Sequence, residues 1–147
     1  LVPTMLSGHT IVVGHGRVGA AVAAGLRADG ARVLVLDSDL ARTARARAAG
    51  HEALVGNACA PDVLAAANLG GAARMVIAIP DSFEAGQVSQ QARAGNPAIE
   101  VIARADTAAE ESHLAACGAN RVVAGQMEIA RAMLALVRSP DATRPAG

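Results

Sequence analysis

Short apolar runs alternate with longer amphipathic stretches along nearly the whole chain. The apolar runs are almost continuous in Val, Ile, Leu, Ala and Met, which is typical of strands buried on both faces of a parallel sheet. Such runs occur at residues 10–13, 33–36, 53–55, 75–79, 101–103 and 121–123. Helices are predicted at residues 18–28, 40–49, 61–67, 83–94, 108–116 and 128–137. This alternation predicts an α/β fold, a Rossmann-like doubly wound parallel six-stranded sheet in the order 3-2-1-4-5-6 with helices on both faces.

The last predicted helix, residues 128–137, differs from the others in its apolar stripe. Ile129, Met133, Leu136 and Val137 recur at helical spacing along one side of it. The stripe packs either on the sheet of its own chain or on a second copy of the domain. The pattern alone leaves both interpretations open.

A glycine-rich loop, GHGRVG at residues 14–19, follows the first predicted strand, and Asp37 ends the second strand about 20 residues later. Gly14 allows a sharp turn, Gly16 leaves room for a phosphate beside the backbone, and Gly19 lets the helix approach the sheet. The helix N-terminus attracts the anion, and Asp37 accepts hydrogen bonds from ribose hydroxyls. The alternative is a glycine-rich turn without a ligand. The full pattern predicts a site for NAD(H) or AMP, ADP or ATP, whereas the 2′-phosphate of NADP would be repelled by Asp37.

Residues at the other strand ends join this predicted site, because ligands of doubly wound sheets bind at the carboxyl ends of the strands. Asn57 either meets the adenosine or forms a plain turn. Arg104 is either a phosphate contact or an exposed surface residue. Arg17 either lies over a phosphate or pairs with Asp39 or Glu84. The residues predicted to contact the nucleotide are Gly14, His15, Gly16, Arg17, Val18, Gly19, Asp37, Ser38, Asn57, Ala58, Ile79, Pro80 and Arg104.

Composition narrows the class of function. A length of 147 residues fits one domain, and a formal net charge of zero with no basic patch argues against nucleic-acid binding. All 13 basic residues are arginines, which excludes Schiff-base lysines and a P-loop lysine. Cys59 and Cys117 stand alone, so we expect reduced thiols, a cytoplasmic setting and no bound metal. We find neither a signal peptide nor a membrane-spanning run, and no arrangement of residues for nucleophilic catalysis.

Six segments of the chain resemble the RCK N-terminal domain family, also called TrkA-N. They are VVGHGRVG (12–19), VLDSD (35–39), GNA (56–58), VIAIPDSFEAG (76–86), NPAIEVIARA (96–105) and GANRVVAGQMEIARAML (118–134). The fourth and sixth segments are most similar to the cytosolic domains of Kef-type cation:proton antiporters, in particular the YbaL-like branch. Asn57 departs from the family pattern, because many members have Asp at that position.

The resemblance implies a regulatory, non-enzymatic domain that binds an adenine nucleotide and gates a potassium or cation transporter. It also implies a homodimer formed through the last helix, residues 128–137, and a transmembrane transporter domain that tethers this cytoplasmic domain to the inner membrane. The nucleotide-binding domain is expected at residues 9–138, after a linker or remnant at 1–8 and before a flexible tail at 139–147. Two alternatives stay open, the cofactor domain of an NAD-dependent oxidoreductase and a dimerisation module that binds no ligand.

Overall fold

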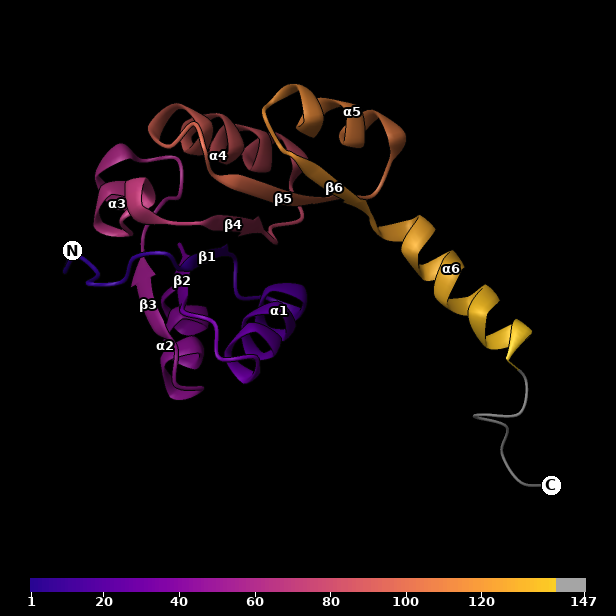
Figure 1. The fold of residues 1–147 in the computed structure, drawn as a ribbon, viewed down its shortest axis with the longest axis horizontal. Coiled ribbons are helices and arrows are strands. Elements are labelled where there is room, and N and C mark those ends of the chain that lie inside the picture. The colour runs from indigo at the N-terminus through magenta and orange to yellow at the C-terminus, as the bar shows by residue number, and fades with distance from the viewer. Residues whose placement is uncertain (140–147) are drawn as a thin grey trace.

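The computed structural model describes residues 1–139 as strands alternating with helices (Figure 1). The strands are β1 (Thr10–Val13), β2 (Val33–Asp37), β3 (Glu52–Val55), β4 (Arg74–Ile77), β5 (Glu100–Ala105) and β6 (Arg121–Ala124). The helices are α1 (Arg17–Ala28), α2 (Leu40–Ala48), α3 (Pro61–Ala66), the 3₁₀ turn η1 (Leu69–Gly71), α4 (Ser82–Gly95), α5 (Ala108–Ala116) and α6 (Gly125–Arg138).

The strands form one parallel sheet in the order β3-β2-β1-β4-β5-β6, which confirms the predicted fold class. Helices α1 and α2 cover one face of the sheet, and α3, α4 and α5 cover the other (Figure 1). Every residue of β1 and β2 is buried, which explains why their sequences are almost entirely apolar. Because β1 lies between β2 and β4, the chain reverses its winding direction at the carboxyl end of β1. Doubly wound sheets bind ligands at this switch point.

The two faces of the sheet carry cores of different size. Long side chains such as Leu34, Leu36 and Met75 fill the face under α3, α4 and α5. Under α1 and α2 the core is smaller and consists of valine and alanine, with Ala23 and Ala46 fully buried. The small alanine side chains let these two helices pack close to the strands.

Several element boundaries differ from the sequence prediction. Strand β4 ends at Ile77, so Ile79 and Pro80 lie in the following loop at the carboxyl edge of the sheet. Helix α4 then begins at Ser82, because the Asp81 carboxylate accepts hydrogen bonds from the first backbone N–H groups of the helix. The last helix begins at Gly125, three residues before the predicted start at Glu128, and follows β6 without a loop.

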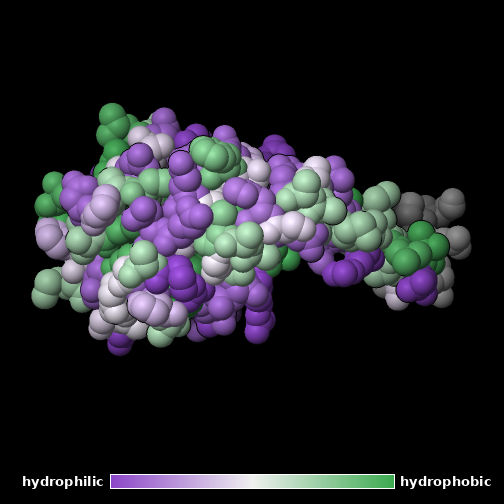
Figure 2. Space-filling model, turned by 90° about the horizontal axis from the view of Figure 1, so that it is seen from above, coloured by the Kyte–Doolittle hydropathy of each residue, from purple (hydrophilic) through white to green (hydrophobic). Residues whose placement is uncertain are grey.

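Helix α6 projects away from the body of the domain as an arm (Figure 1). None of its residues is buried, and Ile129 and Met133 are 62% and 63% exposed. Hydrophobic residues lie along this arm (Figure 2). The interpretation that the last helix packs on its own sheet is therefore wrong, because the chain turns outward directly after β6.

The segment before β1 lies against the domain. The Thr4 backbone N–H donates to the Ala66 carbonyl, and the Gly8 N–H donates to the Gly71 carbonyl. The Asn68 side chain donates to the carbonyl of Leu6. These bonds hold the segment along α3 and η1.

No helix within residues 1–139 has the length and apolarity that crossing a bilayer requires. The predicted tail lies outside the described residues, apart from Ser139.

Candidate functional site

The glycine loop joins β1 to α1 at the switch point of the sheet. Gly14 has a φ of +94°, a conformation that favours glycine. A Cβ atom at Gly19 would lie 1.8 Å from the Gly14 carbonyl oxygen, so helix and loop meet without room for a side chain. A Cβ at Gly16 would meet nothing within 4 Å, so the space beside this residue is open. Gly16 caps α1 without a side-chain hydrogen bond, which leaves N–H groups of the first turn for an anion or water.

Two adjoining hollows lie at this edge of the sheet. The loop hollow, about 500 Å³, is lined by Gly14, Gly16, Arg17, Val18, Asp37, Arg42, Ala78, Ile79, Pro80 and Arg104. The inner hollow, about 170 Å³, is lined by Val13, Gly14, Leu36, Asp37, Ser38, Arg42, Gly56, Ala58, Ile79, Pro80, Asp81 and Glu84. Asp37 and Arg42 belong to both, so this pair stands where the two hollows meet.

Asp37 is 5% exposed and is held by three hydrogen bonds. Its Oδ2 accepts from the backbone N–H of His15 at 2.8 Å and from Arg42 Nε at 2.9 Å. Its Oδ1 accepts from the backbone N–H of Asp39 at 2.8 Å. The carboxylate therefore ties the glycine loop to the start of α2.

The Asp37 carboxylate is kept ionised by these bonds. Burial alone would raise the pKa of Asp37, but the hydrogen bonds from Arg42, Asp39 and His15 outweigh it and hold the pKa below its ordinary value. The paired Arg42 guanidinium has a raised pKa for the reciprocal reason, the hydrogen bond to Asp37. The site thus presents a fixed negative charge next to a fixed positive one.

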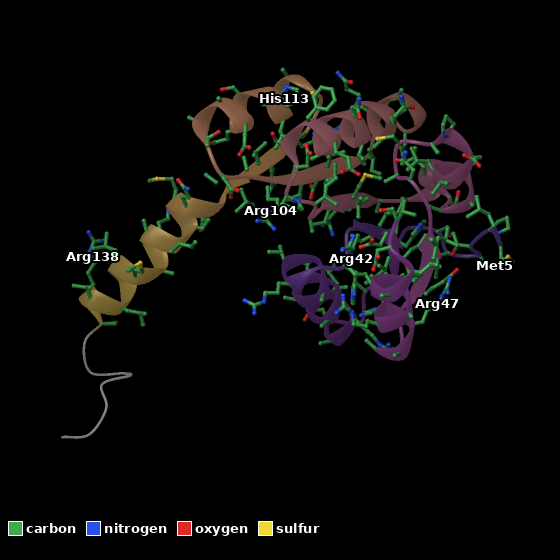
Figure 3. The ribbon with its side chains drawn as sticks, turned by 180° about the vertical axis from the view of Figure 1, so that it is seen from behind. Met5, Arg42, Arg47, Arg104, His113 and Arg138 are labelled. Carbon is green, nitrogen blue, oxygen red and sulfur yellow. The ribbon has the colours of Figure 1, made fainter. Side chains whose placement is uncertain are left out.

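Charge is divided between the two hollows. In the loop hollow three arginines, from α1, α2 and β5, face a single carboxylate, that of Asp37. In the inner hollow three carboxylates face a single arginine, Arg42. Arg42 and Arg104 extend toward the same edge of the sheet from its two halves (Figure 3). An elongated ligand with its anionic groups at one end fits this arrangement.

His15 occupies the glycine loop, but its ring does not line either hollow. The ring is buried and meets the ring of His51 edge to face, with centroids 5.9 Å apart. Burial, followed by the nearby His15 and Arg27, lowers the pKa of His51. His15 is among the residues predicted to contact the nucleotide; in the structure its backbone N–H reaches the site through Asp37, and its ring turns to His51.

The structure brings most of the predicted site residues together. Ten line one or both hollows: Gly14, Gly16, Arg17, Val18, Asp37, Ser38, Ala58, Ile79, Pro80 and Arg104. Gly19 is buried in the helix–loop contact. Asn57 lines neither hollow; its Oδ1 accepts from the Cys59 N–H, which favours the turn among its two interpretations. Arg17 has no ion pair within residues 1–139, so pairing with Asp39 or Glu84 is not observed.

Sequence reasoning missed Arg42. Its backbone N–H donates to the Asp39 carboxylate, which caps α2, and its side chain turns back to Asp37. The available signal was an arginine in the first turn of a helix, five residues after the acid that ends β2. Asp81 and Glu84, which line the inner hollow, were not among the residues predicted for the site.

The residues present suit an adenine nucleotide better than a metal ion. The open space at Gly16, the uncapped N-terminus of α1 and the neighbouring arginines can hold phosphate, and Asp37 can accept from a ribose. Across residues 1–139 no group of three or more His, Cys, Asp or Glu side chains could hold a metal ion. Because Arg42 pairs with Asp37, the carboxylate repels a 2′-phosphate less than a free carboxylate would. Discrimination against NADP stays a prediction.

Two curated relatives match this chain along most of its length. One is YbaL of Escherichia coli (strain K12), which is named as a cation/proton antiporter. It is 38% identical to this chain over 141 residues. Potassium channel protein 1 of Methanocaldococcus jannaschii is 29% identical over 132 residues. The matches cover 96% and 86% of this chain but only 25% and 40% of the relatives, so the chain spans a minor part of each.

Solved structures show the same fold. The TrkA-N domain of the E. coli inner membrane protein YbaL superposes with a TM-score of 0.86 at 38% identity, covering 90% of this chain and 98% of that one. The Kef C-terminal domain of Shewanella denitrificans in its AMP-bound form gives 0.76 at 24% identity, covering 91% and 82%. The NAD-bound GsuK channel gives 0.75 at 17% identity, covering 83% and 22%. The TrkA-N family pattern matches residues 10–125, and with this match and the YbaL similarity the chain belongs to the TrkA-N domain family.

Proposed function

We propose that this chain is a regulatory domain that binds an adenine nucleotide, NAD(H) or AMP, ADP or ATP, and gates a potassium or cation transporter. One observation carries the proposal: the glycine loop and Asp37 meet at two adjoining hollows of opposite charge at the switch point of the sheet. An adenine nucleotide has matching parts, a neutral adenosine and next to it an anionic phosphate group, which is terminal in AMP, ADP and ATP and central in NAD(H).

The proposed pose follows from these charges. The phosphates lie in the loop hollow, beside the open face of Gly16 and within reach of Arg17 and Arg104. The ribose lies at Asp37, and the adenine enters the inner hollow against apolar residues such as Ala58 and Ile79. The nucleotide-bound states named for the Kef domain and the GsuK channel support this choice of ligand class.

Coupling to transport requires a second element, and we assign this role to α6. The helix carries an unpartnered apolar stripe on an arm that leaves the domain body. A second copy of this chain, packed on that stripe, would form a homodimer whose two clefts move relative to each other when nucleotide binds. A ligand shifts such an equilibrium only when it binds one arrangement more tightly than the other.

The transporter partner is inferred from the relatives, in which this domain makes up a minor part of a longer protein. On this proposal the domain lies in the cytoplasm, tethered to the inner membrane, and has no catalytic role. An oxidoreductase cofactor domain and an empty dimerisation module are the competing functions. Hydride transfer to a substrate would support the first competitor, and the lack of any saturable nucleotide binding would support the second.

The direct test is calorimetric titration of the 147-residue chain with NAD+, NADH, AMP, ADP, ATP and NADP+. Saturable binding of at least one adenine nucleotide is expected, with NADP+ weaker than NAD+. Cation flux through the full-length protein in proteoliposomes, with and without the nucleotide that binds, then tests gating. No binding by any of the six would contradict the proposal at its first step.

A further inference from the structure

Most of the hydrogen-bond acceptor positions on Asp37, the proposed ribose contact, are already occupied by groups of the protein itself. A carboxylate offers about four acceptor positions, two on each oxygen. In Asp37 both positions of Oδ2 are taken, by the His15 N–H and by Arg42 Nε, and one position of Oδ1 is taken by the Asp39 N–H. One acceptor position remains, on Oδ1. A ribose diol carries two hydroxyl groups, so Asp37 cannot accept a hydrogen bond from both.

Arg42 offers the donors that this acceptor lacks. A guanidinium has five N–H groups, and among residues 1–139 only the one on Nε of Arg42 has an acceptor. Arg42 lines both hollows, and its side chain is 42% exposed. Two contacts fix the residue in place, its backbone N–H on the Asp39 cap and its Nε on Asp37. The free donors are thus positioned before any ligand arrives.

We propose that Arg42 is a second ribose-reading residue, which shares the sugar of the nucleotide with Asp37. One ribose hydroxyl donates to the free position on Asp37 Oδ1, and an oxygen of the diol accepts from an Nη group of Arg42. Arg42 thereby determines specificity for ribonucleotides over deoxynucleotides. This inference rests on the proposed adenine-nucleotide site and adds to it the chemistry by which the sugar is recognised.

The test pairs a protein variant with the removal of single hydroxyls from the ligand. ADP, 2′-deoxyADP and 3′-deoxyADP are titrated by calorimetry into the unaltered chain, Arg42→Met and Arg45→Met. Arg45 lies exposed on the same helix, and its substitution removes the same charge, so Arg45→Met is the matched control. The unaltered chain and Arg45→Met should bind ADP about tenfold or more tightly than at least one deoxy analogue. In Arg42→Met the preference over the analogue that lacks the oxygen read by Arg42 should fall below about twofold, whereas any preference that comes from Asp37 should persist.

Each other outcome has a separate meaning. If Arg42→Met keeps the preference of the unaltered chain over both analogues, or weakens all three ligands equally, Arg42 only positions Asp37 and the inference is wrong. A chain that binds ADP without preferring it over either analogue also overturns the inference. No binding of ADP or any other adenine nucleotide instead removes the proposed function. Each comparison is a ratio of two affinities measured on the same protein preparation. Partial unfolding of Arg42→Met therefore does not mimic the expected result, and thermal melting measures how much of that variant is folded.

Discussion

Gly19 packs against the Gly14 carbonyl oxygen so closely that a Cβ atom added at Gly19 would lie 1.8 Å from that oxygen. The atom that would be struck belongs to the backbone, so no side-chain rotation relieves the overlap. This contact fixes the distance between α1 and β1. It also sets the position of the helix N-terminus that we propose meets the phosphate.

Gly19→Ala should therefore destabilise the domain by about 2–4 kcal/mol, as expected when a buried site is overpacked against backbone. Gly25→Ala is the matched control, because a Cβ there meets nothing within 4 Å on the same helix. That change should stabilise the domain by about 0.5–1 kcal/mol through the higher helix propensity of alanine. Urea unfolding measures both, and equal effects of the two substitutions would contradict the contact.

Substitutions at Gly16 should weaken nucleotide binding without destabilising the fold. Its φ of −79° suits any residue, and a side chain there meets open space, so Gly16→Ala and Gly16→Val should melt within a few degrees of the unaltered chain. The added atoms occupy the space assigned to the phosphate. Nucleotide affinity should fall in Gly16→Ala and be lost in Gly16→Val, as measured by calorimetry. Unchanged binding by Gly16→Val would place the phosphate elsewhere.

Asp37 supports the fold as well as the proposed ligand. Asp37→Ala leaves the buried N–H of His15 and the N–H of Asp39 without their acceptor, so the free energy of unfolding at pH 7 should fall by about 2–3 kcal/mol. The folded-state pKa of Asp37 is lowered, so its contribution is complete above the unfolded value of about 3.9 and is lost as the pH falls through the folded pKa. The difference between the two chains should therefore shrink at pH 3. A difference that grows in acid would contradict this assignment.

His51 should make the domain less stable in mild acid. Its pKa is lowered by burial and by the nearby His15 and Arg27, whereas an unfolded chain restores a histidine pKa of about 6.5. Below that pH the unfolded chain binds the proton more readily, so stability falls as the pH drops from 7.5 to 5.5. His51→Gln should flatten this dependence, measured as the urea midpoint at each pH. A slope equal to that of the unaltered chain would show that another group is responsible.

The apolar stripe of α6 should hold two copies together. Ile129→Glu with Met133→Glu places charges on the exposed stripe and should convert the dimer to a monomer in sedimentation velocity. Nucleotide affinity should change less than about threefold, because no α6 residue lines either hollow. Arg131→Gln, on the same helix, should leave the dimer intact. A monomeric unaltered chain would remove α6 from the proposed coupling.

Local features of the sequence were enough to predict the architecture. The apolar runs gave the strands and their parallel order because strands buried on both faces show little alternation. The spacing of Gly14, Gly16 and Gly19 located the loop because each glycine answers a backbone requirement. Asp37 followed from its place at the end of β2.

The directions in which side chains point within the site were harder to predict from the sequence. His15 and Asn57 were predicted as contacts from their positions beside the loop and strand end, yet the ring of His15 turns to His51 and Asn57 closes a turn. Position along the chain shows which edge of the sheet a residue reaches. It does not show whether the side chain points into the cleft or into the core.

The sequence by itself determined the order of strands and helices, the glycine loop and the acid opposite it, because these depend on local periodicity and backbone conformation. Only the tertiary structure decided that Arg42 pairs with Asp37, that opposite charges gather in two hollows, and that α6 leaves the domain. These features join residues from separate elements. Their geometry depends on how the sheet and helices pack, which no spacing along the chain records.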